Sequence, residues 1–450
     1  MTRRSPLWRV LALLAALSML AAACGDDDDG GDEAAPDTED TTEDTTEEES
    51  GPGSLAGLRG TLPLIELSED FEARLLEQDA ELVDFNYAGE SYDAVVVIAL
   101  AAQIAGTDGV EYANEINGVT RGGEKCDSFE SCNALIAAGT TDIDYDGISG
   151  PLEFSGNGEP TEASYGILEF GDDNRVDDSL TEFRAATAPP EADVDQVPVV
   201  GTRAGDGVLK IGTLLPETGS LAFLGPPEIA GVELAVADIN AAGGALGVPV
   251  EVTLSDSGDT STDIANQSVD RLLGESVDGI VGAASSGVTL TVIDKVVNAG
   301  VVMFSPANTS KALSTYDDKG LYFRTAPSDI LQGQVLGEVI VDDGHTTVGI
   351  LALDDPYGTG LAEDLTAALE ESGVEVVATE IYDPAAQTFD TEVGEMVSAD
   401  PEAIVVIGFE ESSRILTTLI EQGVGPSDKG VYGVDGNMGN ALGESFEAGE

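Results

Sequence analysis

The sequence predicts an α/β fold of two Rossmann-like lobes, each built on a parallel β-sheet and joined by a hinge. From Val208 onward, short apolar stretches alternate with stretches of helical periodicity. The strand-like stretches are apolar at almost every position, which is typical of parallel strands covered on both faces. One bridging segment, GLYFRTAPSDILQG, interrupts the alternation. The interruption divides the pattern into two runs, and therefore into two lobes.

The first run, at about 208–325, predicts lobe 1. In its first helix Val232, Val236 and Ile239 recur at helical spacing, and the glycine pair at 243–244 ends the helix. The expected strands and helices, in chain order, are LKIGTLLP, PEIAGVELAVADINAAGG, VPVEVTL, TDIANQSVDRLLG, VDGIVGA, VTLTVIDKVVNAG and VVMFS.

The second run, at about 330–450, predicts lobe 2 by the same alternation. Its helices end at glycine in two cases, and its strands are again almost wholly apolar. The expected elements are TTVGILAL, GLAEDLTAALEESG, VEVVATEIY, FDTEVGEMVSA, AIVVIGF, ESSRILTTLIEQG and GVYGVDG.

An earlier block, at about 55–185, has too few strands to form a good core alone. It contains an amphipathic piece, DFEARLLEQ, and an apolar helix, SYDAVVVIALAAQIAG. A two-strand pattern follows, in which DGISGPLEF and EASYGILEF flank a turn-rich stretch. Residues 186–207 are rich in Pro, Gly and acidic residues, which predicts a linker to the segment 208–450.

The charge of the chain excludes one class of partner. It has 18 Lys and Arg against 86 Asp and Glu, a net charge of -68. Such a surface repels phosphate backbones, so no nucleic acid is expected as a partner. The charge is typical of a solvated acidic shell that keeps a secreted protein soluble, and a cationic partner is the alternative.

The N-terminus predicts export. A basic stretch, MTRRSPLWR, precedes an apolar run too short to span a bilayer. Small residues before Cys24 resemble the lipobox of bacterial lipoproteins, with Ala21 where Leu is usual, so residues 1–24 are expected to be a signal peptide and Cys24 to be lipidated. Ordinary signal-peptide cleavage is the alternative. Residues 25–54 are almost all acid, Thr, Gly and Pro, which predicts a disordered tether.

The two other cysteines are expected to form a disulfide. Cys126 and Cys132 lie six positions apart in a chain predicted to be exported. A metal site would need further soft ligands, and the single histidine, His345, is distant in sequence. We therefore expect no metal and no cofactor.

Seven stretches from residue 208 onward resemble a known family when taken together. They resemble the N-terminal two-thirds of bacterial ABC-transporter substrate-binding proteins of the leucine/isoleucine/valine-binding type, the periplasmic binding proteins of type 1. The resemblance implies an extracytoplasmic receptor that captures an amino acid or similar polar ligand for an ABC permease, bound to the membrane by its lipid anchor. The stretches are KIGTLLPETGSLAFLGPPEIAGVELAVADINAAGG, GAASSGVT, VVMFSPANTS, FRTAPSD with QG, DDPYGTG and VYGVDG.

The remaining family segments occur at the wrong end of the chain. The family continues with a G-T-x-P segment, a Y-D-A helix and a G-x-S-G-P-x-x-F hairpin, and here GLRGTLPLIEL, ESYDAVVVIALAAQIAG and YDGISGPLEF come first. We therefore expect a circular permutation. In the alternative, the chain is a fragment of a tandem array of binding proteins.

The same hairpin explains a calcium-loop pattern. Asp142 to Glu153, DIDYDGISGPLE, matches the EF-hand pattern at each specified position. An EF-hand needs a helix on each side, whereas here Pro151 lies inside the loop and strand and turn signals follow. The hairpin is favoured, and a calcium-dependent melting temperature abolished by Asp144→Ala would favour calcium.

A free amino acid presents a carboxylate and an ammonium, and both must be paired on leaving water. Hydroxyls and N–H groups at a helix N-terminus suit the carboxylate, and clefts form at the carboxyl ends of parallel strands. The resemblance assigns the ammonium to Asp435, which is one methylene shorter than the Glu of branched-chain binders. Ser285, Ser286 and Thr289 lie between a strand end and a helix start, where this requirement of the carboxylate would be met. The resemblance adds Ala307 and Thr309, which match family positions that supply a backbone carbonyl and further donors.

The resemblance also implies aromatic and apolar walls for the ligand side chain. Each candidate has an alternative: the hydroxyls as helix caps, the aromatics as ordinary buried residues, and Asp435 as a turn residue. The expected walls are Tyr357, Phe409, Phe223, Leu224 and Tyr92.

Two other functional classes are alternatives to a transport protein. A sensory module on the same fold would report the ligand to a membrane partner. An enzyme is not expected, because the sequence has no G-x-S-x-G elbow and no metal-ligand cluster, and His345 has no evident nucleophile beside it.

Overall fold

The computed structural model describes residues 53–446. The signal peptide at 1–24, the lipidation of Cys24 and almost all of the tether lie outside the described residues, and these remain predictions.

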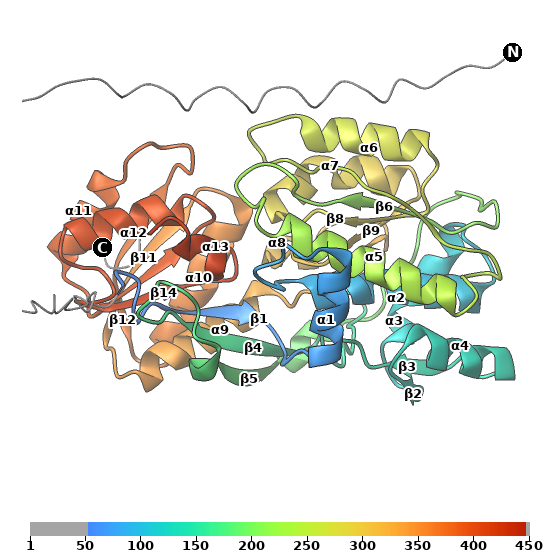
Figure 1. Cartoon of the computed structure of the whole chain (residues 1–450), viewed down its shortest axis with the longest axis horizontal. Helices are drawn as coiled ribbons and strands as arrows, with labels where there is room; N and C mark the ends of the chain where they lie inside the picture. The colour runs from blue at the N-terminus through green and yellow to red at the C-terminus, as the bar shows by residue number, and fades with distance from the viewer. Residues whose placement is uncertain (1–52, 447–450) are drawn as a thin grey trace, which may run out of the picture. The chain divides into compact units, whose positions relative to one another are not determined.

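Lobe 1 is built on a five-stranded sheet in which neighbouring strands are all parallel (Figure 1). Helices α5 (Gly225–Ala241) and α2 (Ala88–Ala105) cover one face, and α6 (Ile264–Gly274) and α7 (Ser286–Asn298) cover the other. The apolar strands are thus buried on both sides, as their sequences predict. In spatial order the strands are β10 (Tyr322–Arg324), β9 (Val302–Ser305), β8 (Gly279–Gly282), β6 (Lys210–Leu214) and β7 (Glu251–Thr253).

Lobe 2 is built on a seven-stranded mixed sheet. Helices α9 (Asp329–Asp342) and α10 (Pro356–Glu371) pack together over one face, and α11 (Asp390–Ala399) and α12 (Ser412–Glu421) over the other. In spatial order the strands are β12 (Glu375–Tyr382), β11 (Thr347–Leu353), β13 (Ala403–Ile407), β14 (Gly430–Gly433), β1 (Arg59–Pro63), β4 (Glu162–Glu169) and β5 (Glu182–Thr187).

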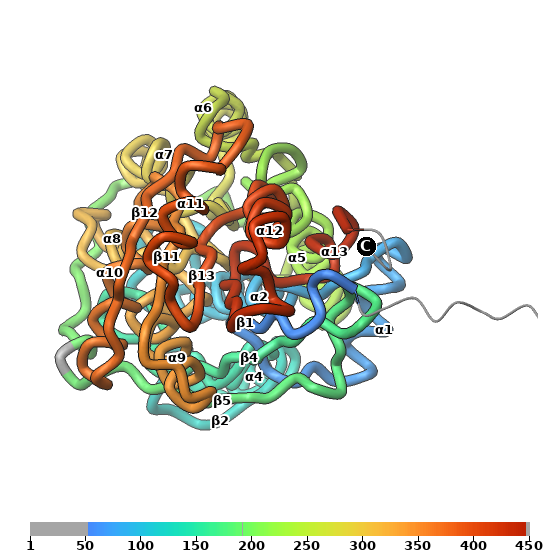
Figure 2. Tube along the Cα trace, turned by 90° about the vertical axis from the view of Figure 1, so that its left-hand side faces the viewer, coloured from blue at the N-terminus to red at the C-terminus, as the bar shows by residue number. Residues whose placement is uncertain are grey.

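The early block contributes to both lobes. Strand β1 pairs in parallel with β14 and antiparallel with β4, so the start and the end of the described chain share one sheet (Figure 2). Helix α2 packs along α5 and against β8 and β9. The two buried cores therefore each combine early and late residues, Val95 with Ile211 in one and Leu62 with Val348 in the other. This explains why the early block lacks a core of its own.

The expected pairing of DGISGPLEF with EASYGILEF does not form. EASYGILE is β4, which pairs with β1 and β5 instead, and the other stretch is mostly loop, with isolated bridges from Gly147 to Gly150 and from Phe154 to Pro160. The cause is Asp93, a buried carboxylate that accepts hydrogen bonds from Ile148 N (3.0 Å) and Ser149 N (2.7 Å). Backbone donors that a strand would give to its neighbour are given to this carboxylate instead.

A small parallel sheet holds the calcium-loop pattern. Strands β2 (Glu124–Cys126) and β3 (Ile143–Tyr145) pair there, and a disulfide joins Cys126 to Cys132 as the sequence predicts. The other helices are α1 (Glu69–Gln78), α3 (Ile116–Val119), α4 (Phe129–Ala138), α8 (Lys311–Ser314) and α13 (Asn440–Gly443), with 3₁₀ turns η1 (Val110–Asn114), η2 (Asp178–Leu180) and η3 (Pro190–Ala192).

One described helix, α2, is long and apolar enough to cross a membrane by length and composition. It is buried from Ala88 to Ala102 by α5, β8, β9 and their neighbours. Its apolar sequence is therefore accounted for by its place in the core of lobe 1.

Candidate functional site

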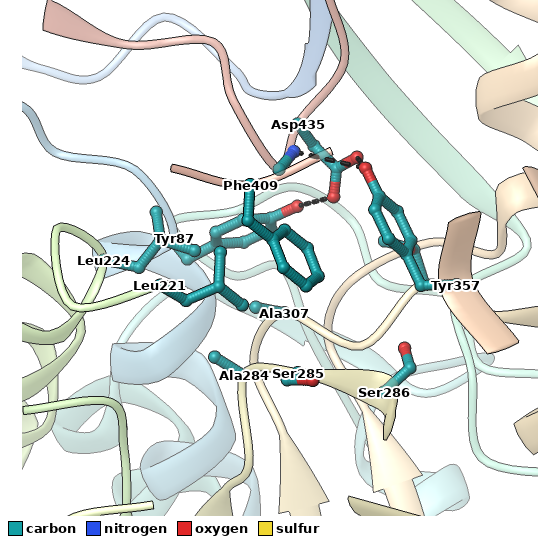
Figure 3. Close-up of a pocket in the computed structure, with 12 residues that line it drawn as sticks. Tyr87, Leu221, Leu224, Ala284, Ser285, Ser286, Ala307, Tyr357, Phe409 and Asp435 are labelled. Carbon is teal, nitrogen blue, oxygen red and sulfur yellow. Dashed lines mark hydrogen bonds between the residues drawn. The ribbon is translucent and has the colours of Figure 1, made fainter. Parts of the chain in front are cut away.

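A small cavity lies between the two lobes, at the carboxyl ends of several parallel strands. About 260 Å³ of space free of protein atoms lies within it, part of which is open to solvent. Strands β8 and β9 of lobe 1 and β13 and β14 of lobe 2 end at it, which is where α/β sheets bind ligands. Its lining consists of Tyr87, Leu221, Leu224, Ala284, Ser285, Ser286, Ala307, Thr309, Tyr357, Phe409, Asp435 and Gly436 (Figure 3).

One end of the cavity is a carboxylate held by two phenols. Asp435 follows β14 and is 4% exposed. Its Oδ2 accepts a hydrogen bond from the Tyr87 hydroxyl at 2.8 Å, and its Oδ1 accepts one from the Tyr357 hydroxyl at 2.7 Å (Figure 3). An added Cβ on the next residue, Gly436, would lie 2.6 Å from the Gly408 carbonyl oxygen, so a larger residue there would displace the acid from this position.

Burial controls the protonation of this end of the cavity. It raises the pKa of Asp435, while the hydrogen bonds from Tyr357 and Tyr87 act in the opposite direction. Burial and then the nearby charge of Asp435 raise the pKa of Asp329, a fully buried residue at the start of α9. Both tyrosines have pKa values well above the usual range, first because they are buried and then because Asp435 is close. The phenols therefore stay protonated and donate to the acid.

Hydroxyl groups line the opposite end (Figure 3). Ser285 is the N-cap of α7, and its Oγ accepts a hydrogen bond from Val288 N at 3.2 Å. Ser286 Oγ accepts one from Ser310 N at 3.3 Å. Thr309 Oγ1 is buried beside the Asp329 carboxyl, whose pKa it lowers, and it forms no hydrogen bond of ordinary geometry in residues 53–446. The positive end of the α7 dipole and hydroxyl groups thus face the cavity, a setting that favours an anion.

The remaining walls are apolar. The rings of Tyr357 and Phe409 are stacked, with centroids 5.4 Å apart and planes 10° apart. Leu221 and Leu224 come from the loop before α5. A ligand held at the two polar ends would therefore place its side chain against aromatic and aliphatic carbon.

Contacts across the cavity hold the lobes together. Ser310 Oγ donates to the Pro356 carbonyl at 2.8 Å, and Glu410 N donates to the Ser220 carbonyl at 3.3 Å. Lys311 Nζ lies 2.8 Å from Asp364 Oδ1. These bonds join the residue 310–311 region and the Ser220 loop of lobe 1 to helix α10 and the β13–α12 loop of lobe 2.

The structure brings eight of the eleven sequence-predicted residues to this cavity, and three lie elsewhere. Tyr92 donates its hydroxyl to Asp238 at 2.8 Å and packs edge-on against Phe71, away from the cavity. Thr289 is fully buried one turn into α7, and Phe223 lines a neighbouring groove. The eight are Ser285, Ser286, Ala307, Thr309, Tyr357, Phe409, Asp435 and Leu224.

Sequence reasoning missed four lining residues, Tyr87, Leu221, Ala284 and Gly436. Tyr87 precedes α2 with φ of 59°, a left-handed conformation that is uncommon outside glycine. No periodicity in the sequence signals that conformation, and it is the conformation that places the ring under Asp435. In the part of the chain that the structure describes, no group of His, Cys, Asp or Glu side chains is arranged to hold a metal ion.

A family model described as "periplasmic binding protein" matches residues 208–446. The chain belongs to the periplasmic binding protein family. That membership places the protein outside the cytoplasm, and it fits the α/β fold described above. The sheet of lobe 1 is parallel, whereas that of lobe 2, predicted to be parallel, is mixed because β4 runs antiparallel to β1 and β5. Residues 55–185, which complete both lobes, lie outside the matched range.

Three curated relatives illustrate the likeness. A Leu/Ile/Val-binding protein homolog 3 of Brucella melitensis is 27% identical over 251 residues, covering 53% of this chain and 66% of that protein. A leucine-, isoleucine-, valine-, threonine- and alanine-binding protein of Pseudomonas aeruginosa is 27% identical, covering 48% and 57%. A chemotactic signal transduction system substrate-binding protein, BasB, of Halobacterium salinarum is 29% identical, covering 45% and 50%. The chain thus spans half to about two thirds of these relatives, all named as binding proteins.

Solved structures are similar over the same share of the chain. The branched-chain amino acid transporter substrate-binding protein LivJ of Streptococcus pneumoniae, in complex with isoleucine, is 29% identical with a TM-score of 0.47, covering 53% of this chain and 67% of that one. The leucine-binding protein LivK of Thermotoga maritima is 22% identical with a TM-score of 0.48, covering 54% and 67%.

Proposed function

We propose that this periplasmic binding protein captures a free amino acid, or a similarly small zwitterion, between its lobes for an ABC importer. One observation carries the proposal: a buried carboxylate, Asp435, faces the hydroxyls of Ser286 and Thr309 across a cavity with apolar walls. One acid and one anion-favouring end are the two settings that the ammonium and the carboxylate of such a ligand need. Relatives named for leucine, isoleucine and valine binding support the same class.

The charges decide which ligand group meets which end. An ammonium leaving water needs an anion, and Asp435 supplies one already oriented by two phenols. A carboxylate suits the N-terminus of α7 and the buried hydroxyl of Thr309. An uncharged ligand would leave the buried acid unpaired, which costs binding free energy.

Isothermal titration with a panel of amino acids, their amides and urea tests the proposal. We expect at least one amino acid to give a saturable heat with the unmodified protein. Asp435→Asn should lower its affinity at least about 100-fold, because a buried charged hydrogen-bonded pair is lost. The matched control is Asp238→Asn, since Asp238 also accepts a tyrosine hydroxyl but lies outside the cavity. No heat from any amino acid would overturn the proposed ligand class.

The importer role adds a membrane permease and a lipid anchor at Cys24. The support is the family membership and the lipobox-like sequence around Cys24. Cys24→Ser should release the protein from the membrane fraction, and loss of the protein should abolish uptake of the ligand found by titration. Unchanged uptake would contradict the importer role without affecting the binding proposal.

A sensory role is the second candidate, favoured by the similarity to the chemotactic substrate-binding protein of Halobacterium salinarum. In that case loss of the protein should remove the behavioural response to the ligand and leave its uptake unchanged. Uptake and response assays on one deletion strain separate the two roles.

We also propose that the chain is a circularly permuted member of its family. The support is that β1, from the segment expected at the C-terminus, pairs with β14 of the same chain. In the alternative tandem array, residues 55–185 would complete another copy. Light scattering and titration should give a monomer with one ligand per chain, and a two-to-one stoichiometry would favour the array.

A further inference from the structure

Arg324, at the end of β10, contacts the loop that carries Thr309 from behind the cavity. Its side chain is fully buried. Nη1 donates to the Asn308 carbonyl at 3.2 Å and to the Ser310 carbonyl at 3.0 Å. These are the carbonyl groups on either side of Thr309. Nη2 donates to Ser314 Oγ at 2.7 Å, so the same guanidinium also fixes the far end of α8.

Glu159 supplies the charge that keeps this guanidinium in place. Arg324 Nε donates to Glu159 Oε2 at 3.0 Å, and Nη2 donates to the same oxygen. Ser314 Oγ also donates to it, at 2.8 Å. Glu159 is 8% exposed and comes from the early block, whereas Arg324 and the loop belong to lobe 1. A buried arginine without this partner would be an uncompensated charge.

The hydrogen bonds of Arg324 engage the backbone of the loop that carries Thr309 and do not engage the Thr309 hydroxyl. The loop of residues 306–310 joins β9 to α8 without regular structure. Arg324 engages the carbonyl groups of residues 308 and 310, and Asp329 N donates to the Thr309 carbonyl at 2.8 Å. With three successive carbonyl groups engaged, the Thr309 hydroxyl lines the cavity and forms no hydrogen bond of ordinary geometry in residues 53–446. The backbone is thus fixed while the side chain stays available.

The second hydroxyl loop is tied to the first. Asn308 Nδ2 donates to the Ala284 carbonyl at 2.7 Å, next to Ser285. Asn308 Oδ1 accepts a hydrogen bond from the Tyr322 hydroxyl at 3.0 Å. A shift of residue 308 would therefore also move the start of α7, where Ser285 and Ser286 lie.

We infer that Arg324 and Glu159 are positioning residues for the carboxylate end of the ligand site. They touch no ligand; their hydrogen bonds fix the position of Thr309 and, through Asn308, its position relative to the start of α7. The planar fork of arginine fits this role because one group reaches two carbonyl oxygens and a carboxylate together. The identity of the ligand group as a carboxylate rests on the proposed function. The part of the inference that Arg324 and Glu159 hold the loop in place rests on their hydrogen bonds alone.

The test uses Glu159→Gln, which keeps the shape of the side chain and removes its charge. Titration compares L-leucine with L-leucinamide, which lacks the carboxylate. We expect the variant to bind L-leucine at least about tenfold more weakly while its affinity for L-leucinamide falls much less. Equal loss for both ligands, or no loss, would overturn the inference. Arg324→Lys should give the same selective loss and serves if the glutamine variant does not fold.

Hydrogen–deuterium exchange of the ligand-free protein supplies a second readout. Exchange in a peptide covering residues 306–314 should rise in Glu159→Gln, and unchanged exchange there would overturn the inference. The control is Asp278→Asn. Asp278 lies directly before the first residue of β8 and forms another buried ion pair, with Arg203, which the variant breaks. It should leave residues 306–314 unaffected. If exchange rises but the unmodified protein binds neither probe nor any other amino acid, the proposed function fails and the positioning of the loop stands.

Discussion

At the residue scale, capture of an ammonium depends on the charge of Asp435. Burial raises the pKa of this acid, and the hydroxyls of Tyr357 and Tyr87 counteract the rise by donating to the ionised form. Tyr87→Phe removes one donor, so the pKa should rise further and a smaller fraction of the acid should be ionised. We expect about tenfold weaker binding of the amino acid at neutral pH. The loss should grow as the pH falls, because the neutral acid no longer pairs with an ammonium.

Titrations between pH 5 and pH 8 measure this effect. Tyr92→Phe is the control, because its hydroxyl donates to Asp238 outside the cavity. Parallel pH profiles for the Tyr87 variant and the unmodified protein would show that Tyr87 does not set the ionisation of Asp435.

The same two tyrosines show what sequence could predict of the site. Residues that follow apolar strands, such as Asp435 and Thr309, reach the cavity because parallel strands all end at one edge. Tyr92 was expected there from its motif, but it lies five residues beyond Tyr87 along α2 and points to Asp238. The position of Tyr87 depends on one left-handed backbone conformation, which neither composition nor periodicity reports.

At the element scale, helices α2 and α5 bury a pair of glutamates against each other. Glu90 lies in the first turn of α2 and Glu228 in the first turn of α5. Burial raises the pKa of Glu90 to about 8, and burial followed by the charge of Glu90 raises that of Glu228 well above its usual value. Neither oxygen of the Glu228 carboxyl has a hydrogen-bond partner in residues 53–446.

The pair should make the protein less stable as the pH rises. In the folded state both carboxyl groups keep protons that they release above pH 4.5 in the unfolded state. The free energy of unfolding should therefore fall as the pH rises from about 4.5 to about 8. Glu228→Gln should reduce this fall and raise the free energy of unfolding at pH 8. Denaturant unfolding at pH 4.5 and pH 8 measures it, with the partly exposed Glu233→Gln on the same helix as control. A gain of equal size at both pH values would contradict the explanation.

Another element-scale prediction concerns the calcium-loop pattern. The ammonium of Lys125 lies 3.0 Å from Asp144 Oδ2, 2.8 Å from Asp146 Oδ1 and 3.5 Å from Glu153 Oε1. One ammonium of the protein thus contacts three carboxylates of the pattern and offsets part of their charge. Lys125→Met should lower the melting temperature most at low ionic strength, where repulsion among these acids is least screened.

Thermal melts in low and high salt, each with and without calcium, check this prediction. The unmodified protein should show no calcium effect beyond that of matched ionic strength, since Lys125 occupies the position that a cation would take. A calcium-dependent rise in the unmodified protein, abolished by Asp144→Ala, would instead show that calcium displaces the lysine.

The elements themselves were predictable to different degrees. From Val208 onward the alternation of strands and helices agrees with the structure, because continuous apolar runs have few ways to be buried other than in a covered parallel sheet. The loop at residues 146–154 was not predictable as a loop. Two of its backbone N–H groups, those of Ile148 and Ser149, donate to Asp93, more than fifty residues earlier, and local sequence carries no record of such a partner.

At the scale of the whole molecule, the fold does not depend on the order in which the early block and the segment 208–450 follow one another along the chain. Gly53 N donates to the Asp172 carbonyl at 2.7 Å, and Val176 N donates to Asn440 Oδ1 at 3.0 Å. Gly53 and Gly443 both lie against Asn174. The first and last described residues are therefore near one another in the fold, close enough for a short linker. Closing that gap costs little loop entropy.

We therefore predict that a reordered chain folds and binds like the natural one. It would run from residue 208 to residue 446, continue through a short Gly-Ser linker into residue 53, and end near residue 187. Because β1 would still pair with β14 and α2 with α5, the cavity would keep both polar ends. Titration should give an affinity within about threefold of that of the natural order, since no contact of the site is altered. A reordered chain that folds, as judged by circular dichroism, but has lost the ligand would show that the junction at residues 186–207 shapes the site and does more than connect the lobes.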